Sequence, residues 1–423
     1  MNDLTPSFER ETGQVILEGP SAGVAGEAPL IPVPGLDLAF DRADGHLCRV
    51  VVDTAGTDGS ISVGEQVAAM LIQLFGAHAP SLISDPAGAH ALLPDLRLAG
   101  TLSSLARLDA ARATSPVPPG SAWWAAEAAE LAERAGLSAR ASAEAHRALA
   151  DLLGQLDSMN TTVLPEPAVR AALAVAALTA AHEPAATTRL REAVGGRPGL
   201  PSAAPPISGF DVAAEVESLE KDRVRLGGLL WMHDPDLVPE GLFRPGLSPY
   251  SDLEVSHEGA QGQVVVEARL APGADCGALN RCLVRLVDPD VRRVLAQAAF
   301  TKTAPDRVRA ELQLPFPLDE LPESWIEVVQ DKLWPVRSAK GHRIRRALRW
   351  ADAALRAERA PAGLAPHSAH DDWTALAAAA WDRCRRDWET VGDAGRADQA
   401  ARRQAAPQPP IDGPAYLAEV FGR

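Results

Sequence analysis

The chain has 423 residues, a net charge of −15 and a hydrophobic fraction of 46%, of which aromatic residues are a small part. A polypeptide of this length is expected to hold about two to four domains with real hydrophobic cores. The negative charge argues against a general affinity for nucleic acid or anionic membranes, because both attract cationic surfaces.

Arginine supplies nearly all of the positive charge, since the only lysines are Lys221, Lys302, Lys332 and Lys340. An excess of Arg, Ala, Pro and Gly with little Lys is typical of a GC-rich bacterial genome. This bias follows codon usage, so a single Arg or Pro residue carries little functional information.

No segment of the chain has the features of an export or membrane signal. Met1 to Pro20 contains several acidic residues and no sustained apolar run, unlike a signal peptide. The longest apolar stretch, Ala171 to Ala181, is too short to span a bilayer. The four cysteines are scattered and are expected to be reduced. The sequence therefore predicts a cytoplasmic protein without membrane association.

Residues 1–110 are predicted to form a small α/β or α+β unit. The alternating segment Leu36–Phe40, a Gly-containing turn and the apolar run Leu47–Val52 together indicate a β-hairpin. Apolar residues at helical spacing from Val67 to Leu74 predict a helix. The segment from Ala79 to Leu105 is interpreted as short pieces and turns.

Residues 121–195 are predicted to form a helical bundle. Three stretches repeat Leu and Ala every three to four residues and are separated by Gly or Pro: Ala122–Ala135, Ala139–Leu156 and Pro165–His182. Short connections of this kind favour antiparallel packing. Residues 196–250 are interpreted as a linker, a helix from Phe210 to Leu226 and a Pro-rich strap.

Residues 251–337 carry the clearest β pattern. Apolar and polar residues alternate from Arg307 to Leu314, as in a strand with one buried face. Pro289-Asp290 marks a hairpin turn between two further apolar segments. Six strands at even spacing suit a β-sandwich of immunoglobulin-like or transthyretin-like architecture. The predicted fold class is thus multidomain α+β, with helical bundles and an antiparallel β-sandwich in the C-terminal half.

Two segments after this module are candidates for binding a partner. Residues 341–403 are predicted to be helical, and Trp373, Trp381 and Trp388 share one face of the helix that follows Asp371. Residues 404–423 are interpreted as a flexible Pro-rich tail with a short docking helix. The candidate partner-binding residues of that helix are Tyr416, Leu417, Val420 and Phe421. The tryptophans also suit core packing, and the tail helix could equally fold back on its own chain.

Two clusters offer possible metal ligands. The loop from Asp53 to Glu65 places Asp58, Gly59 and Glu65 at the spacing of an EF-hand calcium loop. Its first and third positions fall on uncharged residues, however, so a loop leading into a helix is the simpler interpretation. His367 and His370 could contribute to a zinc site, but Asp371 and Asp372 beside them are well placed to cap the helix that begins there, and capping is the favoured interpretation.

The one basic run of the chain extends from Lys340 to Arg349. It could contact nucleic acid, or it could be the solvated face of an amphipathic helix. No phosphate-binding loop, nucleophile elbow or recognisable nucleophilic cysteine occurs, so no cofactor is expected and an enzyme is disfavoured.

The sequence favours a non-catalytic adaptor or regulatory protein that acts through contacts with another protein. One alternative is a metal-dependent enzyme or metal-binding protein that uses the Asp53–Glu65 loop or the His367/His370 cluster. A second is a regulator that contacts nucleic acid through the Arg343–Arg349 helix, and the negative net charge of the chain argues against nucleic acid as its partner.

Overall fold

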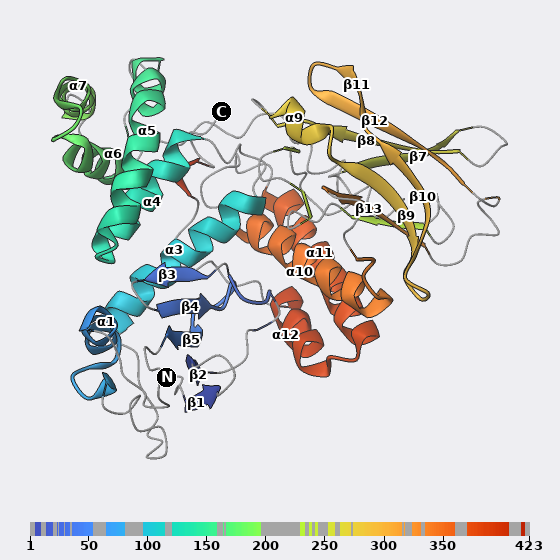
Figure 1. Cartoon of the computed structure of the whole chain (residues 1–423), viewed down its shortest axis with the longest axis horizontal. Coiled ribbons are helices and arrows are strands. Elements are labelled where there is room, and N and C mark those ends of the chain that lie inside the picture. Colours follow the sequence, from blue (N-terminus) through green and yellow to red (C-terminus); the bar gives the residue numbers. More distant parts are fainter. Residues whose placement is uncertain are drawn as a thin grey trace. The chain divides into compact units, whose positions relative to one another are not determined.

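The computed structural model mixes helices with three β-sheets in the part of the chain that it describes (Figure 1). The described residues are 5–9, 14–19, 23, 25–28, 30–33, 36–53, 65–80, 96–114, 121–158, 164, 166–195, 229–232, 237–238, 242–243, 253–258, 263–271, 274–314, 317, 324–330, 335–359, 370–405 and 416–418. Among them, no helix combines the length and apolar character needed to cross a membrane.

The chain divides into two compact units. Unit 1 contains Met1–Ala110, Ser121–Ala203 and Tyr416–Phe421, and unit 2 contains Ala111–Gly120, Ala204–Ala415 and Gly422–Arg423. Each unit is therefore assembled from segments that are distant in the sequence.

Unit 1 begins with a five-stranded antiparallel sheet in the order β1-β2-β5-β4-β3. Its strands are β1 (Thr5–Glu9), β2 (Gln14–Glu18), β3 (Ile31–Val33), β4 (Leu36–Phe40) and β5 (Leu47–Asp53). The predicted hairpin is confirmed as β4 paired with β5. The hairpin also pairs on both of its outer sides, with β2 and β3, which the sequence did not indicate.

The helices of unit 1 follow the sheet along the chain. They are α1 (Glu65–Phe75), α3 (Leu96–Thr114), α4 (Ala122–Arg134), α5 (Ser138–Ser158), α6 (Glu166–Thr179) and α7 (Pro184–Gly195). The predicted helices correspond to α1, α4, α5 and α6. The prediction of short pieces up to Leu105 is wrong from Leu96 onward, because Leu102, Leu105 and Ala106 form the buried stripe of α3. The last helix of the bundle, α7, was also missed, although Pro184 suits a first helical position.

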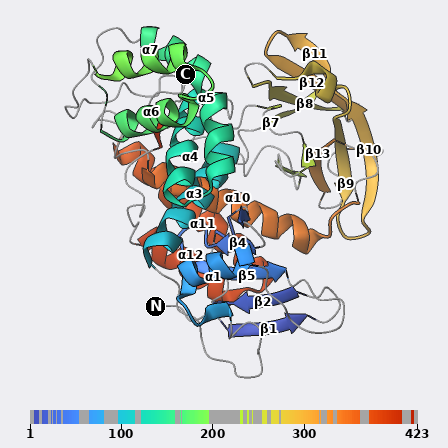
Figure 2. The same cartoon turned by 60° about the vertical axis from the view of Figure 1, so that its left-hand side comes forward.

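The helical bundle packs closely because alanine lines its contacts. On α4 the buried residues are six alanines and the adjacent pair Trp123 and Trp124. Small alanine side chains let neighbouring helices approach, and both indole rings are fully buried. Figure 2 shows α4 and α5 side by side, with α6 and α7 beyond them. Arg140 of α5 reaches back to Asp109 of α3, with an N–O distance of 2.6 Å.

Unit 2 contains two four-stranded sheets, ordered β10-β9-β13-β6 and β11-β12-β8-β7. The strands are β6 (Leu229–Met232), β7 (Leu253–Glu258), β8 (Gln263–Arg269), β9 (Leu283–Asp288), β10 (Arg293–Ala299), β11 (Thr301–Ala304), β12 (Arg307–Gln313) and β13 (Ser324–Val329). A short helix, α9 (Cys276–Leu279), precedes β9. The six strands predicted from the sequence, at 253–256, 263–270, 282–288, 294–300, 307–314 and 325–330, are confirmed as β7, β8, β9, β10, β12 and β13, whereas β11 was not predicted. The first sheet is mixed rather than purely antiparallel, because the unpredicted β6 pairs in parallel with β13.

Apolar side chains of both sheets contribute to one hydrophobic cluster. Val264 and Val308 come from one sheet, and Leu286, Ile326 and Val328 come from the other. Every described residue of β13 is buried. Because side chains alternate along a strand, Ile326 and Val328 lie in this cluster while Trp325 and Glu327 point to the opposite face.

Three helices complete unit 2: α10 (Ala339–Arg359), α11 (His370–Val391) and α12 (Ala394–Ala405). Their positions agree with the helical prediction for residues 341–403. Gly392 ends α11 with a φ of 85°, a left-handed conformation that glycine adopts without steric penalty. The predicted linker at Ser115–Gly120, the helix Phe210–Leu226 and the spacer before Tyr416 lie outside the described residues.

All four cysteines are free, and three of them are buried. Burial raises the pKa of the Cys48 thiol to about 12 and that of Cys282 to about 11. Burial also raises the pKa of Cys384. These three side chains are therefore protonated at neutral pH and serve as apolar filling rather than as nucleophiles.

Candidate functional site

The best-defined candidate is a contact between α4 and the residues Tyr416, Leu417 and Ala418, called here the Tyr416 segment. All three residues are buried, and the segment belongs to unit 1. The Tyr416 ring lies 5.6 Å from the Trp124 ring, at an interplanar angle of 48°. The backbone N–H of Leu417 donates a hydrogen bond of 2.8 Å to Oε2 of Glu127.

The sequence of α4 explains why these two groups act together. Trp124 and Glu127 are three residues apart, so they lie on the same side of the helix, which we call the α4 face. Trp124 supplies an aromatic wall, and Glu127 supplies a carboxylate one turn further along. The surrounding alanines leave room for a second segment to lie against the helix.

The hydrogen bond to Glu127 satisfies a specific need of the docked segment. Leu417 and Ala418 are helical, and the first N–H groups of a helix have no partner within it. A carboxylate is a favourable acceptor there, because it bonds the free N–H and carries a charge opposite to the positive end of the helix dipole. The α4 face thus accepts a hydrogen bond from a backbone N–H beside its contact with an aromatic side chain.

The predicted partner-binding residues of the tail are only partly placed. Tyr416 and Leu417 are buried against their own chain, which matches the alternative that the tail folds back. Val420 and Phe421 lie outside the described residues. The receiving residues Trp124 and Glu127 were missed by sequence reasoning, because 290 residues separate Glu127 from Leu417 and no local pattern connects them.

The predicted tryptophan face of α11 lies in the interior of unit 2. Trp381 and Trp388 have no exposed surface and Trp373 has almost none. The indole Nε1 of Trp381 donates to Glu358 of α10 at 2.6 Å, and Arg396 of α12 lies over the Trp388 ring at 4.6 Å. These contacts join α11 to both neighbouring helices, so the tryptophans present no exposed face to a partner in this structure.

Some arginine side chains of the basic helix predicted from Arg343 to Arg349 are buried. Arg346 and Arg349 are buried, and Arg346 forms a two-point ion pair with Asp387 of α11. The Nε–Oδ2 and Nη2–Oδ1 distances are 2.8 and 2.5 Å. Only part of the run is therefore placed for a contact with nucleic acid.

A buried ionic cluster connects the mixed sheet of unit 2 to α10. Arg285 of β9 pairs with Glu327 of β13, and both side chains are almost fully buried. The Nε2 atom of His342 lies 3.7 Å from the other oxygen of Glu327. The His342 ring stacks on Trp325 at 4.7 Å, and the Arg346 guanidinium lies 5.0 Å from the same indole.

The sequence contains a pattern from which this ion pair could have been predicted. Arg285 stands in the middle of Leu-Val-Arg-Leu-Val, and Glu327 stands in the apolar segment Trp-Ile-Glu-Val-Val. A charged residue in the centre of a buried strand requires a partner of opposite charge. Two such strands, paired as neighbours, would have indicated the ion pair.

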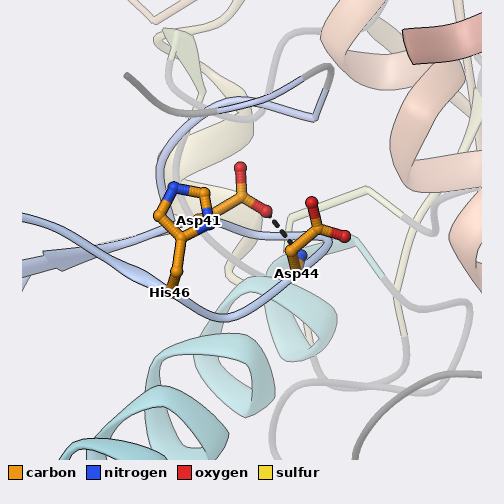
Figure 3. Close-up of side chains that lie close together, drawn as sticks. All are labelled: Asp41, Asp44 and His46. Carbon is orange, nitrogen blue, oxygen red and sulfur yellow. Dashed lines mark hydrogen bonds between the residues drawn. The ribbon is translucent and has the colours of Figure 1, made fainter. Parts of the chain in front are cut away.

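One group of described side chains has the composition of a metal site. Asp41, Asp44 and His46 of the β4–β5 turn offer ligand atoms within 4.8 Å of one another (Figure 3). Asp41, however, is fully buried and already accepts three backbone hydrogen bonds. Its Oδ2 accepts from the N–H of Gly23 at 2.6 Å, and its Oδ1 accepts from Ala43 at 2.8 Å and Asp44 at 2.5 Å.

These bonds show that Asp41 organises the turn and joins it to the loop at Gly23. Figure 3 shows the Asp44 carboxylate directed away from the ring of His46. Helix α3 also packs directly against the turn. Gly45, which has a φ of 70°, lies so close to Ser103 and Arg107 that a Cβ atom at this position would collide with them. The geometry is that of a structural turn.

The structure does not test the two metal sites predicted from the sequence, because some of their ligands lie outside the described residues. The loop residues between Asp53 and Glu65, with Asp58, lie outside the described residues, and so does His367. Glu65 is the first residue of α1, and His370 is the first residue of α11. Both metal hypotheses stay predictions. The sequence assigned no catalytic residue and no cofactor, and these assignments also stay predictions.

Comparisons with known proteins give no further guidance on this chain. No protein-family model, no curated protein and no solved structure matches it.

Proposed function

We propose that the protein is a non-catalytic adaptor that binds a polypeptide segment on the α4 face, at the place where its own Tyr416 segment lies. The observation that carries the proposal is the hydrogen bond from Leu417 N–H to Glu127, made beside the Trp124–Tyr416 contact. It pairs a charged acceptor with an aromatic wall, as a helix-binding surface requires.

The docked residues define the chemistry of the partner. The ligand is a segment in which an aromatic residue is followed by leucine and alanine, with the helical conformation beginning at the leucine. The aromatic ring packs on Trp124, and the free N–H at the helix start bonds to Glu127. A phosphate backbone would instead be repelled by the Glu127 carboxylate and by the net charge of −15.

The proposal predicts how the affinity depends on the α4 face. Tyr416→Ala in the full chain weakens the contact of its own segment and so leaves the face open. A fluorescent peptide with the sequence of residues 414–423 is expected to bind this variant saturably. Adding Glu127→Ala is expected to weaken binding about tenfold or more, because a charge-assisted hydrogen bond contributes about 1.5–3 kcal/mol.

A matched control is available on the same helix. Glu133 is exposed on α4, so Glu133→Ala removes an identical side chain away from the α4 face and is expected to leave the affinity unchanged. Fluorescence anisotropy measures all three dissociation constants. A peptide that fails to bind the Tyr416→Ala chain, or that binds equally well without Glu127, would contradict the proposal.

Two finer assignments belong to the same proposal. We propose that the two sheets of unit 2 form a β-sandwich of immunoglobulin-like or transthyretin-like architecture, supported by the hydrophobic cluster to which both contribute. We also place the adaptor in the cytoplasm, where free thiols such as the exposed Cys276 stay reduced. In this scheme unit 2 is the scaffold and unit 1 carries the binding face.

A further inference from the structure

We propose that His342 makes the contact between α10 and the mixed sheet of unit 2 sensitive to pH. The contact is complete while the imidazole ring is neutral, and it opens more readily when the surrounding solution can protonate that ring. The inference concerns unit 2 alone and does not depend on the α4 face.

His342 is an interior residue of unit 2. Its side chain is 2% exposed, and its ring stacks on Trp325 of β13 at an interplanar angle of 18°. Its Nε2 atom lies 3.7 Å from Oε2 of Glu327, which stands two residues after Trp325 and on the same face of the strand. The imidazole is therefore part of the surface by which α10 packs on β13, so a change in its charge acts directly on that contact.

The two carboxylates nearest to the ring each form an ion pair with an arginine. Glu327 pairs with Arg285 of β9, and Asp387 of α11 pairs with Arg346 of α10. The distance of 3.7 Å from His342 to Glu327 is longer than a hydrogen bond, so Arg285 is the closer partner of this carboxylate. Two positive and two negative charges thus balance one another while the imidazole is neutral.

A proton on His342 would add a third cation to this cluster. The Arg346 guanidinium lies 5.0 Å from the centre of the same Trp325 ring on which the imidazole stacks. Arg345, only partly exposed, stands three residues after His342 and therefore on the same side of α10. A buried charge that has neither water nor its own counter-charge is strongly disfavoured. The closed cluster therefore favours the neutral ring.

The other charged groups described on the packed elements do not offset this preference. On α10, Arg349 and Arg356 are further buried cations, and the buried Asp352 stands ten residues, about 15 Å, beyond His342. On α11, the residue one turn before Asp387 is a further cation, Arg383. Strand β6 consists of Leu-Leu-Trp-Met and carries no charge. Among the described residues, Glu327 is thus the carboxylate that faces the ring, and Arg285 already pairs with it.

This arrangement fixes the direction of the pH response. A solvated histidine becomes protonated below about pH 6.5, as His342 would in an opened state. Because the closed cluster holds the ring neutral, opening takes up one proton below that pH. The equilibrium constant for opening therefore rises by up to about tenfold for each pH unit below about 6.5, and it is constant above about pH 7.5.

Hydrogen exchange of the full chain, followed by mass spectrometry, measures this opening for each element separately. Protection factors, corrected for the pH dependence of intrinsic exchange, are compared at about pH 7.5 and about pH 5.5. Peptides from α10 and β13 of the wild type are expected to lose about tenfold in protection at the lower pH. Peptides from α4, in unit 1, are the internal reference and are expected to keep theirs.

Two substitutions remove the titrating group while retaining different parts of the contact. His342→Phe keeps an aromatic ring on Trp325, and His342→Gln keeps an uncharged polar group near Glu327. The near-UV circular dichroism at about pH 7.5 shows which variants fold as the wild type does. In these, the protection of α10 is expected to be equal at the two pH values. His182→Gln changes an exposed histidine of unit 1 and is expected to retain the tenfold loss.

The wild type alone can overturn the inference. Equal protection of α10 at the two pH values would do so, and so would an equal loss in α4, which would indicate a general effect of acid on the chain. A loss that begins only below about pH 5 would assign the response to carboxylates. A tenfold loss that persists in a folded His342 variant would assign it to another group, and this result also contradicts the inference.

Discussion

Replacing Glu327 with glutamine is expected to lower the free energy of unfolding by about 3–5 kcal/mol. Glu327 and Arg285 are 4% and 1% exposed, and they form an ion pair. The glutamine is nearly the same size as the glutamate but carries no charge. It therefore removes the negative charge that pairs with the buried Arg285 guanidinium and that also lies beside His342.

Chemical denaturation followed by tryptophan fluorescence measures this loss, because Trp325 lies next to Glu327 in β13. Glu311→Gln provides the matched control, since Glu311 is exposed on β12 and pairs with Arg309 at 3.0 Å. An exposed pair of this kind contributes only about 0–1 kcal/mol. A loss at Glu327 no larger than that at Glu311 would show that the pair is not buried.

The double variant Arg285→Met with Glu327→Leu refines this prediction. Two apolar side chains of similar volume remove both charges together and leave no unpaired ion. The double variant is therefore expected to be more stable than Glu327→Gln, and as stable as the wild type or nearly so. This pattern distinguishes an unpaired buried charge from a general disruption of packing, in which the double variant would be the less stable.

Replacing Asp387 with alanine is expected to have a similar effect, about 3–5 kcal/mol. Asp387 receives two hydrogen bonds from the Arg346 guanidinium, and the side chains of Asp387 and Arg346 are 7% and 9% exposed. Two parallel bonds fix the guanidinium geometrically, and this fixed group lies over the Trp325 ring. Removing Asp387 therefore weakens the α10–α11 contact. It also removes the ion pair that fixes the Arg346 guanidinium over Trp325 of β13.

Asp382→Ala is the matched control for this second substitution. Asp382 lies on the same helix and forms ion pairs with Arg385 and Arg386, both within one turn of helix. Its side chain is less buried, and such local pairs contribute about 0.3–0.5 kcal/mol. The same denaturation experiment applies. Equal losses for the two aspartates would mean that the Arg346 pair is not specifically buried and bidentate.

The sequence predicts the strands of unit 2 well because their pattern is local. Val308, Ala310 and Leu312 alternate with charged residues, and all three are buried as this alternation requires. The β4–β5 hairpin is predictable for the same reason, because its turn residues lie between two apolar strands. Helices α4, α5 and α10 also follow from periodicity within a single segment.

The missed elements depend on pairing between distant segments. Strand β6 contains only Leu-Leu-Trp-Met and gains its partner, β13, from almost a hundred residues later in the chain. Strand β2 is short and stands between Gly13 and Gly19, and it is stabilised by pairing with the central strand β5. A pattern confined to a few residues cannot show that such a partner exists.

One side of the candidate site, the tail segment, could be predicted from the sequence, whereas the α4 face could not. The apolar pattern of the tail identified Tyr416 and Leu417 as docking residues, and both are buried. The receiving face was hidden because Glu127 resembles any other acidic residue on an Ala-rich helix. Trp124 resembles a core residue, and it is fully buried here. Only the fold brings these two side chains to the segment that they hold.

In the function that we propose, the α4 face is a binding surface on which the protein places its own Tyr416 segment. The most direct test compares the affinity of the peptide of residues 414–423 for two full-length chains, the wild type and Tyr416→Ala. The tethered segment competes with the peptide in the wild type but not in the variant. We expect the wild-type chain to bind the peptide at least tenfold more weakly. Equal affinities for the two chains would contradict the account.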